Sequence, residues 1–127
     1  MKLLLDTHAF LWFVTGDSRL SPRARRRMEE PGAELYVSAA SVWEMAVKSS
    51  LGKLTLPLPL GPFMDQKRDQ GYRVLPVEWH HAWAVENLPF HHRDPFDRLL
   101  AVQARVEGLV LVTGDPAFKA YGVKTLW

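Results

Sequence analysis

The chain has 127 residues, of which 47% are hydrophobic and 24% are charged, with a formal net charge of +2. This is the size of one ordinary domain with a buried core, so we expect a single domain over residues 1–127. The absence of cysteine excludes a disulfide framework, a thiolate zinc site and a cysteine nucleophile, and it fits a reducing cytoplasm.

The first residues have some character of a secretion signal, because Met1-Lys2 precedes three leucines. Asp6 and His8 interrupt this apolar run, and no small-residue cleavage site follows. No stretch approaches the roughly 20 apolar residues of a membrane span. We therefore expect a cytoplasmic protein with no membrane partner.

The first half of the chain alternates short apolar stretches with amphipathic ones. Residues 2–5 predict a buried strand and residues 7–14 a helix, and Ser21 before a proline is a typical start for the next helix. Residues 34–38 predict a second strand, and residues 39–50 a helix. On that last helix, Trp43, Ala46, Val47 and Ser50 lie at helical spacing.

The second half continues this alternation after a proline-rich arm at residues 54–62, which predicts a loop or a surface arm. A short helix to residue 70, a strand over 72–76 and a helix over 80–87 follow. The remaining elements are a helix opened by Asp94-Pro95 and ended by Gly108, then two strands. These strands span residues 109–113 and 123–126.

Strands separated by helices predict an α/β fold with a parallel sheet covered on both faces. In such sheets ligands bind outside the carboxyl ends of the strands. Asp6 directly follows the first strand, and Asp115 follows the strand 109–113 across Gly114. Each could simply cap the next helix, but two aspartates at matching strand ends favour a functional site.

Three further acids have competing structural explanations. Asp94 and Asp97 frame the start of the late helix, where Asp94 is a typical N-cap and the helix dipole favours both charges. Glu44 lies one turn after Ser41 and four residues before Lys48. Position alone favours a surface Glu–Lys pair there, worth about a few tenths of a kcal/mol.

Four clustered carboxylates would need a compensating cation. Each like-charged pair about 4 Å apart repels by roughly 4 kcal/mol at an effective dielectric constant near 20. Mg²⁺ or Mn²⁺ would relieve this repulsion, since hard cations prefer oxygen ligands. Such a site can activate water for attack on a phosphodiester.

The sequence resembles PIN-domain ribonucleases, specifically the VapC-type toxins of bacterial toxin–antitoxin pairs. The resemblance covers nearly the whole chain in the family's order. It rests on residues 3–12 (LLLDTHAFLW), 38–48 (SAASVWEMAVK), 52–54 (GKL), 92–104 (HRDPFDRLLAVQA) and 111–118 (LVTGDPAF). Any one stretch would be weak, whereas the combination is highly specific.

This resemblance implies a Rossmann-like three-layer α/β/α sandwich and an endoribonuclease that needs Mg²⁺ or Mn²⁺. It also implies a homodimer, an RNA substrate and a small cognate antitoxin. The family's four acids, which hold the metal and are catalytic, fall on Asp6, Glu44, Asp97 and Asp115. The motif around Glu44 thus outweighs the surface-pair interpretation.

Other positions that match or flank the family motifs have supporting roles. Thr113 matches the hydroxyl before the last acid, and Asp94 and Ser41 are candidates for supporting contacts around the metal ligands. Arg93 and Arg98 flank the acids and are candidates for contacting RNA. Gly114 departs from the family, where many relatives carry a larger and often basic residue, and we expect this to alter substrate contacts.

The remaining basic residues and histidines have simpler explanations. The arginine run at residues 23–27 is usually a solvated helix face, although in a nuclease it could steer phosphates. The pairs His80-His81 and His91-His92 do not chelate a metal simply, because adjacent helical residues face different ways. His8 could orient Asp6, but a packed histidine is the favoured interpretation.

Two other function classes fit the sequence less well. A phosphatase of the haloacid-dehalogenase type needs a second aspartate two residues after the nucleophile, where this chain has His8. A non-catalytic PIN-like interaction module typically loses acids, whereas this chain has all four. The sequence does not identify the RNA, the antitoxin or the number of metal ions.

Overall fold

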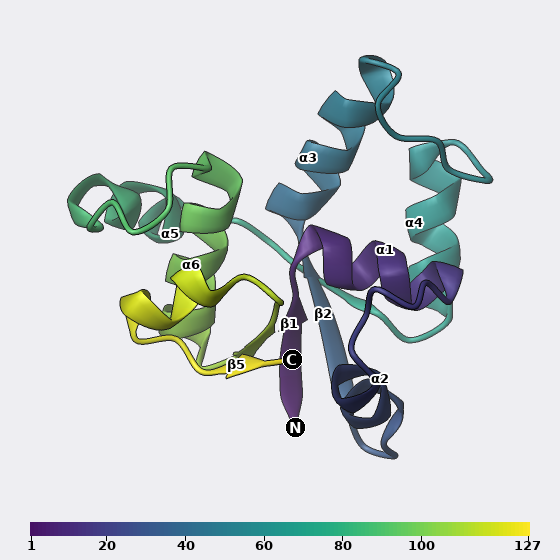
Figure 1. Ribbon diagram of the computed structural model, residues 1–127. Helices are drawn as coiled ribbons and strands as arrows, with labels where there is room; N and C mark the ends of the chain where they lie inside the picture. The colour runs from purple at the N-terminus through teal and green to yellow at the C-terminus, as the bar shows by residue number, and fades with distance from the viewer.

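The computed structural model describes all residues, 1–127, and arranges them in an alternating α/β order (Figure 1). The elements in chain order are β1 (Lys2–Leu5), α1 (Thr7–Thr15), α2 (Pro22–Glu29), β2 (Glu34–Ser38), α3 (Ala39–Ser50), α4 (Leu60–Asp69), β3 (Arg73–Leu75), α5 (Trp79–Ala84), η1 (Val85–Asn87), α6 (Pro95–Glu107), β4 (Val110–Val112), η2 (Pro116–Tyr121) and β5 (Thr125–Leu126). Only η2, a 3₁₀ segment, has no counterpart in the sequence-based expectation.

The five strands form one parallel sheet in the order β3-β2-β1-β4-β5. The chain moves outward from β1 to β2 and β3, then returns to the other side of β1 to add β4 and β5. The carboxyl ends of β1 and β4 therefore flank the point where the strand order reverses. This is where parallel α/β sheets bind ligands.

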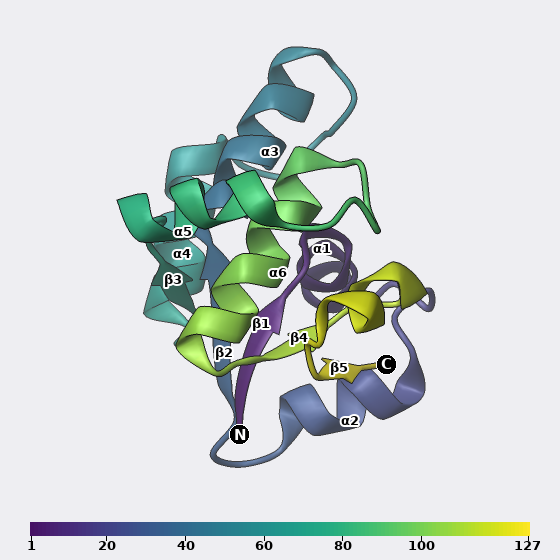
Figure 2. The same ribbon diagram turned by 90° about the vertical axis from the view of Figure 1, so that its left-hand side faces the viewer.

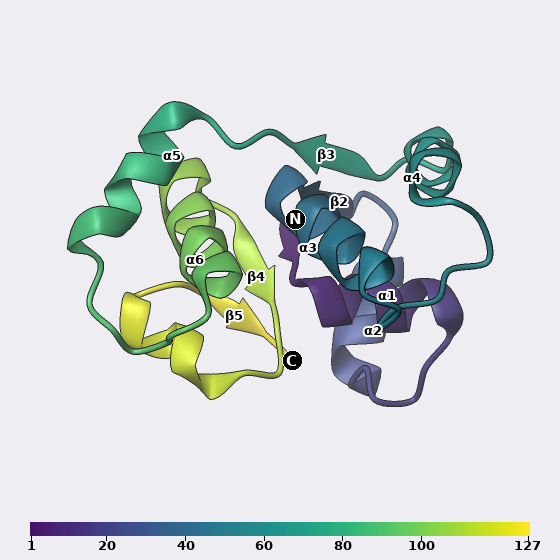
Figure 3. The same ribbon diagram turned by 90° about the horizontal axis from the view of Figure 1, so that it is seen from above.

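The central strand β1 faces a separate hydrophobic core on each side of the sheet. Leu3 and Leu5 belong to one core, which also takes buried residues from α1, α2, α3 and α4. Leu4 belongs to the other core, built mainly from α6 and η2. Figure 3 shows α5 and α6 on one side of the strands and α1, α2 and α4 on the other, and Figure 2 views the sheet through α6. The predicted three-layer α/β/α sandwich is confirmed.

Short polar side chains start the helices that surround the site. Asp6, Ser38 and Asp94 are the N-caps of α1, α3 and α6, and each accepts hydrogen bonds from backbone N–H groups of the first turn. Gly16 ends α1 with φ at 69°, a left-handed conformation that favours glycine. Capping thus fixes where each helix begins relative to the strand before it.

The four residues at helical spacing on α3 are exposed, and a different face of the helix is buried. The buried residues of this helix are Ala40, Ser41, Glu44 and Met45. Trp43 is instead 63% exposed and touches Phe96 edge-on at 5.0 Å between ring centroids. The helix has apolar side chains on two faces, and packing against the sheet and α6 selects the face that carries Glu44.

Residues 54–59 of the proline-rich arm form no helix or strand, as predicted, whereas its last three residues belong to helix α4, which begins at Leu60. Pro62 falls in the first turn of this helix, where proline is tolerated. Leu54, Leu56 and Leu60 pack against the core beneath α1, while Leu58 remains exposed. None of the helices is both long and apolar enough to cross a lipid bilayer.

Candidate active site

Asp6 lies where β1 meets β4. Its backbone N–H donates to the carbonyl of Val112 at 3.1 Å, and its Oδ1 accepts the Ala9 N–H at 2.7 Å. Burial raises the pKa of the Asp6 carboxyl above its usual value, and the nearby charge of Glu44 adds to this. A hydrogen bond with Thr113 opposes the shift. Asp6 therefore caps α1 and also brings a poorly solvated carboxylate to the sheet edge.

Asp97 extends from the first turn of α6 into the same region. Burial, followed by the negative charge of Asp94, raises its pKa to about 7. Asp6 and Glu44 add smaller increases, whereas His92 lowers it. Asp6, directly after β1, and Glu44, on α3, are therefore close enough to Asp97 for their charges to act on it.

Asp115 completes this edge from the loop after β4. Its Oδ1 accepts the Ala117 N–H at 2.9 Å and so caps η2, while its Oδ2 lies 2.8 Å from His92 Nε2. The hydroxyl of Thr113 accepts the Asp115 N–H at 3.1 Å. Thr113 thus contacts both strand-end aspartates and sets their relative position.

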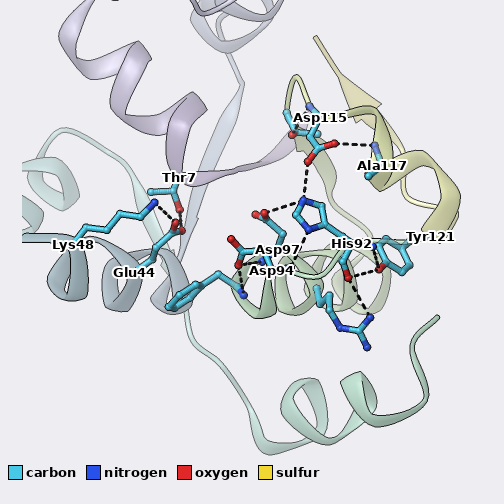
Figure 4. A network of polar contacts seen from close by, with 12 residues as sticks. Thr7, Glu44, Lys48, His92, Asp94, Asp97, Asp115, Ala117 and Tyr121 are labelled. Atoms are coloured by element: carbon cyan, nitrogen blue, oxygen red, sulfur yellow. Dashed lines mark hydrogen bonds and ion pairs between the residues drawn. The ribbon is translucent and has the colours of Figure 1, made fainter. Parts of the chain in front are cut away.

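Glu44 combines the two interpretations that its sequence position allowed. Lys48 lies 2.6 Å from Oε2 in the predicted i,i+4 pair, but Glu44 itself is only 7% exposed. Thr7 donates its hydroxyl hydrogen to Oε1 at 2.6 Å. Figure 4 shows Glu44 held by Thr7 and Lys48 across the site from Asp97 and His92. The carboxylate is fixed in the cluster by a cation and a hydroxyl.

His92 is a site residue that the sequence analysis missed. Its Nε2 lies 2.8 Å from Asp115 and 3.2 Å from Asp97, so that one ring nitrogen bridges two carboxylates. Its Nδ1 accepts the Asp94 N–H at 3.1 Å, which leaves the ring proton on Nε2. The adjacent-pair spacing of the histidines gave no sign of this role, although His92 begins the family motif at residues 92–104.

Arg98 requires a correction, because we expected it to contact RNA. It is 4% exposed, and its guanidinium donates to backbone carbonyls rather than pointing into solvent. The acceptors are Val85, Leu88, Pro89 and His92. Arg98 therefore fixes the loop that carries His92. Its neighbour Arg93 is exposed and remains free to contact a substrate.

Asp94 and Ser41 differ in how far their polar atoms are satisfied. Asp94 Oδ1 accepts the N–H groups of Phe96 at 2.8 Å and Asp97 at 3.4 Å, as its capping interpretation predicts. Ser41 lies one turn before Glu44 on the buried face of α3. Its Oγ is the one buried side-chain polar atom without a hydrogen-bond partner. An unmet hydroxyl is thus available beside Glu44.

His81 and His8 lie in different environments. His81 is buried, and its ring links the start of α5 to Glu107 at 3.3 Å, so it joins two helices away from the acids. His8 is exposed and stacks on Trp12 rather than packing into the core. Its positive charge, when present, lowers the pKa of Asp6.

Comparison with known families identifies the domain. The PIN domain family model matches residues 3–124. The chain belongs to the PIN-domain family. A search of curated proteins gives no match.

Solved structures share the fold of this PIN domain at low sequence identity. VapBC2 from Rickettsia felis, bound to a promoter DNA fragment, matches with a TM-score of 0.72 and 14% identity over 99% of this chain and 98% of that chain. VapBC-1 from nontypeable Haemophilus influenzae gives 0.67 and 16% over 99% and 97%. FitAcB from Neisseria gonorrhoeae gives 0.60 and 20% over 98% and 96%.

The side chains of this PIN domain fit a divalent cation. The donors are mostly carboxylate oxygens, the ligands that hard cations prefer, and ligand atoms of His92, Asp97 and Asp115 lie within 4.8 Å of one another. Burial, and then the negative charge of Asp94, raises the pKa of Asp97, and a bound cation would favour its charged form. The cluster is therefore chemically suited to bind Mg²⁺ or Mn²⁺.

Proposed function

We propose that this PIN domain is a metal-dependent endoribonuclease that acts as the VapC-type toxin of a toxin–antitoxin pair. The observation that carries the proposal is the convergence of Asp6, Asp97 and Asp115 beside Glu44 at the reversal point of the sheet. Membership of a nuclease family and a fold shared with toxin–antitoxin complexes support it.

Each acid has a definable part in this proposal. Asp6, Asp97 and Asp115 would hold the cation, and Glu44, steadied by Thr7 and Lys48, would complete the negative cluster. When bound, Mg²⁺ or Mn²⁺ supplies an activated water and neutralises charge that develops on the phosphodiester. Asp94 keeps the start of α6 in register, so that Asp97 reaches the cluster.

Access for a polymer substrate is consistent with the exposure of the site. The Asp115 side chain is 39% exposed, and Arg93 lies in the loop that leads into α6. We assign Arg93, which is exposed, to contact with a backbone phosphate. The choice of RNA over DNA comes from the family resemblance, because hydrolysis by an activated water needs no 2′-hydroxyl.

Exposed aromatic residues support the proposal of protein partners. Trp43, Trp79, Trp83 and Phe90 are each more than half exposed. Large exposed apolar side chains of this kind often mark protein interfaces. We assign them to contacts with a second copy of the chain or with the cognate antitoxin.

The test is cleavage of a generic RNA with Mn²⁺, with chelator, and with Asp6→Asn. Asp6→Asn removes a charge without changing volume and retains an N-cap, so the fold should persist while activity is lost. Asp65→Asn, an exposed aspartate on α4, is the matched control and should cleave normally. Cleavage by folded Asp6→Asn at the wild-type rate would refute the assignment. Hydrolysis of a small phosphate ester without RNA cleavage would instead indicate a phosphatase.

A further inference from the structure

A cavity opens beside the acid cluster, on the side facing α1. It has a volume of about 450 Å³. Asp6 and Asp115 form one wall, and His8, Trp12, Arg19 and Trp127 form much of the rest. A molecule in this cavity would touch the same aspartates that the proposed reaction uses.

The apolar part of this cavity is made of ordered aromatic rings. His8 stacks on Trp12 with centroids 5.2 Å apart and an interplanar angle of 11°. Trp127 lies 6.0 Å from Trp12 at an angle of 58°. Both tryptophans are partly buried against the core beneath α1, which holds their rings in place while leaving part of each exposed. The cavity therefore presents preformed aromatic surfaces.

Gly114 is what allows Trp127 to lie there. A Cβ atom at position 114 would come within 2.9 Å of Trp127 Cε2, closer than real contacts permit. Any larger residue at this position would push the indole away from Asp115. The glycine that departs from the family pattern and the tryptophan beside it thus form one structural unit.

Arg19 adds an oriented cation to the rim. Its guanidinium lies 4.9 Å from the centroid of the Trp12 ring. Asp17 holds it through Nη2 at 2.7 Å and Nε at 3.2 Å, while Nη1 makes no hydrogen bond within the chain. An anionic group at the rim could therefore accept a hydrogen bond from Arg19 without displacing Asp17.

We propose that this cavity is a nucleobase subsite, in which the base of a nucleotide next to the cleaved bond stacks on Trp127. This inference rests on the proposed nuclease function. A neutral base can lie beside the two aspartates without electrostatic repulsion, and aromatic faces stack on any base. Arg19 would contact the phosphate that enters over the rim.

The test uses cleavage of one RNA oligonucleotide with a single cut site and versions of it lacking the base at each neighbouring position. Trp127→Ala should lower kcat/KM by roughly five- to a hundredfold, the loss expected for one stacked base. Trp127→Phe should retain most of the cleavage rate, because it keeps an aromatic ring. This variant separates the loss of stacking from a folding defect. Leu51→Ala, which removes an exposed apolar side chain just after α3, is the control and should match the wild type.

The abasic substrates give the decisive comparison. For wild type, removing one particular base should cost about as much as Trp127→Ala, and the two losses should not add when combined. Full additivity at every position, or a wild-type rate for Trp127→Ala, would overturn the subsite.

Quenching of tryptophan fluorescence by the same RNA separates this inference from the proposed function. Quenching that depends on Trp127, in a protein that cuts no RNA, would support the subsite and refute the nuclease. RNA cleavage by the wild type and Trp127→Ala at equal rates would refute only the subsite.

Discussion

Replacing Asp97 by asparagine should stabilise the metal-free protein at neutral and higher pH. The pKa of Asp97 is raised from 3.8 to about 7, so the folded protein keeps a proton that the unfolded chain releases above about pH 4. The free energy of unfolding therefore falls as pH rises through this window, and the full cost is present by pH 8. Asparagine does not ionise and avoids this cost.

The shift sets an upper limit of about 4 kcal/mol on this effect, at about 1.4 kcal/mol per pKa unit. The Asp97 side chain is 25% exposed, and water screens part of the repulsion, so we expect about 2 kcal/mol. For a domain of this size that corresponds to about 5–10 °C in melting temperature.

The assay is a pair of thermal or urea melts at pH 4 and pH 8 in the presence of a chelator. The difference between Asp97→Asn and wild type should be small at pH 4 and reach its full size at pH 8. Asp65→Asn, which also removes one negative charge, should show no such growth with pH. Equal stability of Asp97→Asn and wild type at pH 8 would refute the claim that the apo cluster is electrostatically strained.

Three further predictions test neighbouring parts of the site. At a Mn²⁺ concentration about 100-fold above the dissociation constant, the free energy of unfolding of the wild type should rise by about 2–3 kcal/mol, and that of Glu44→Gln should rise by less. If Mn²⁺ does not raise the melting temperature of the wild type, the acid cluster is purely structural. Asp94→Asn should change stability and cleavage rate very little, and Asp94→Ala should lower stability by about 1 kcal/mol. Asp97→Asn should lower the cleavage rate by several orders of magnitude. An inactive Asp94→Asn together with an active Asp97→Asn would exchange the roles of the two residues. Arg98→Ala should destabilise the fold by about 3 kcal/mol, because it leaves four carbonyls without their donor, while a melt of Arg93→Ala should match the wild type.

Local features of the sequence determined the strand order along the chain and the edge at which the site lies. Buried strands that end in Asp6 and near Asp115, and the capping pattern at Asp94, depend on contacts within a few residues, so they can be recognised without a fold. The α/β architecture followed from the alternation of strand and helix patterns.

Contacts between distant segments decided the rest. Sequence spacing offered two faces of α3, and only packing against the sheet and α6 buried Glu44 while exposing Trp43. We expected Arg98, and not His92, to take part in the site. In the fold, backbone carbonyls of a loop enclose Arg98, and His92 lies between the carboxylates of Asp97 and Asp115. Trp127 is distant in sequence from Trp12, and a missing Cβ at position 114 lets the sheet bring their rings together. Such placements depend on the summed packing of several elements, which no local pattern contains.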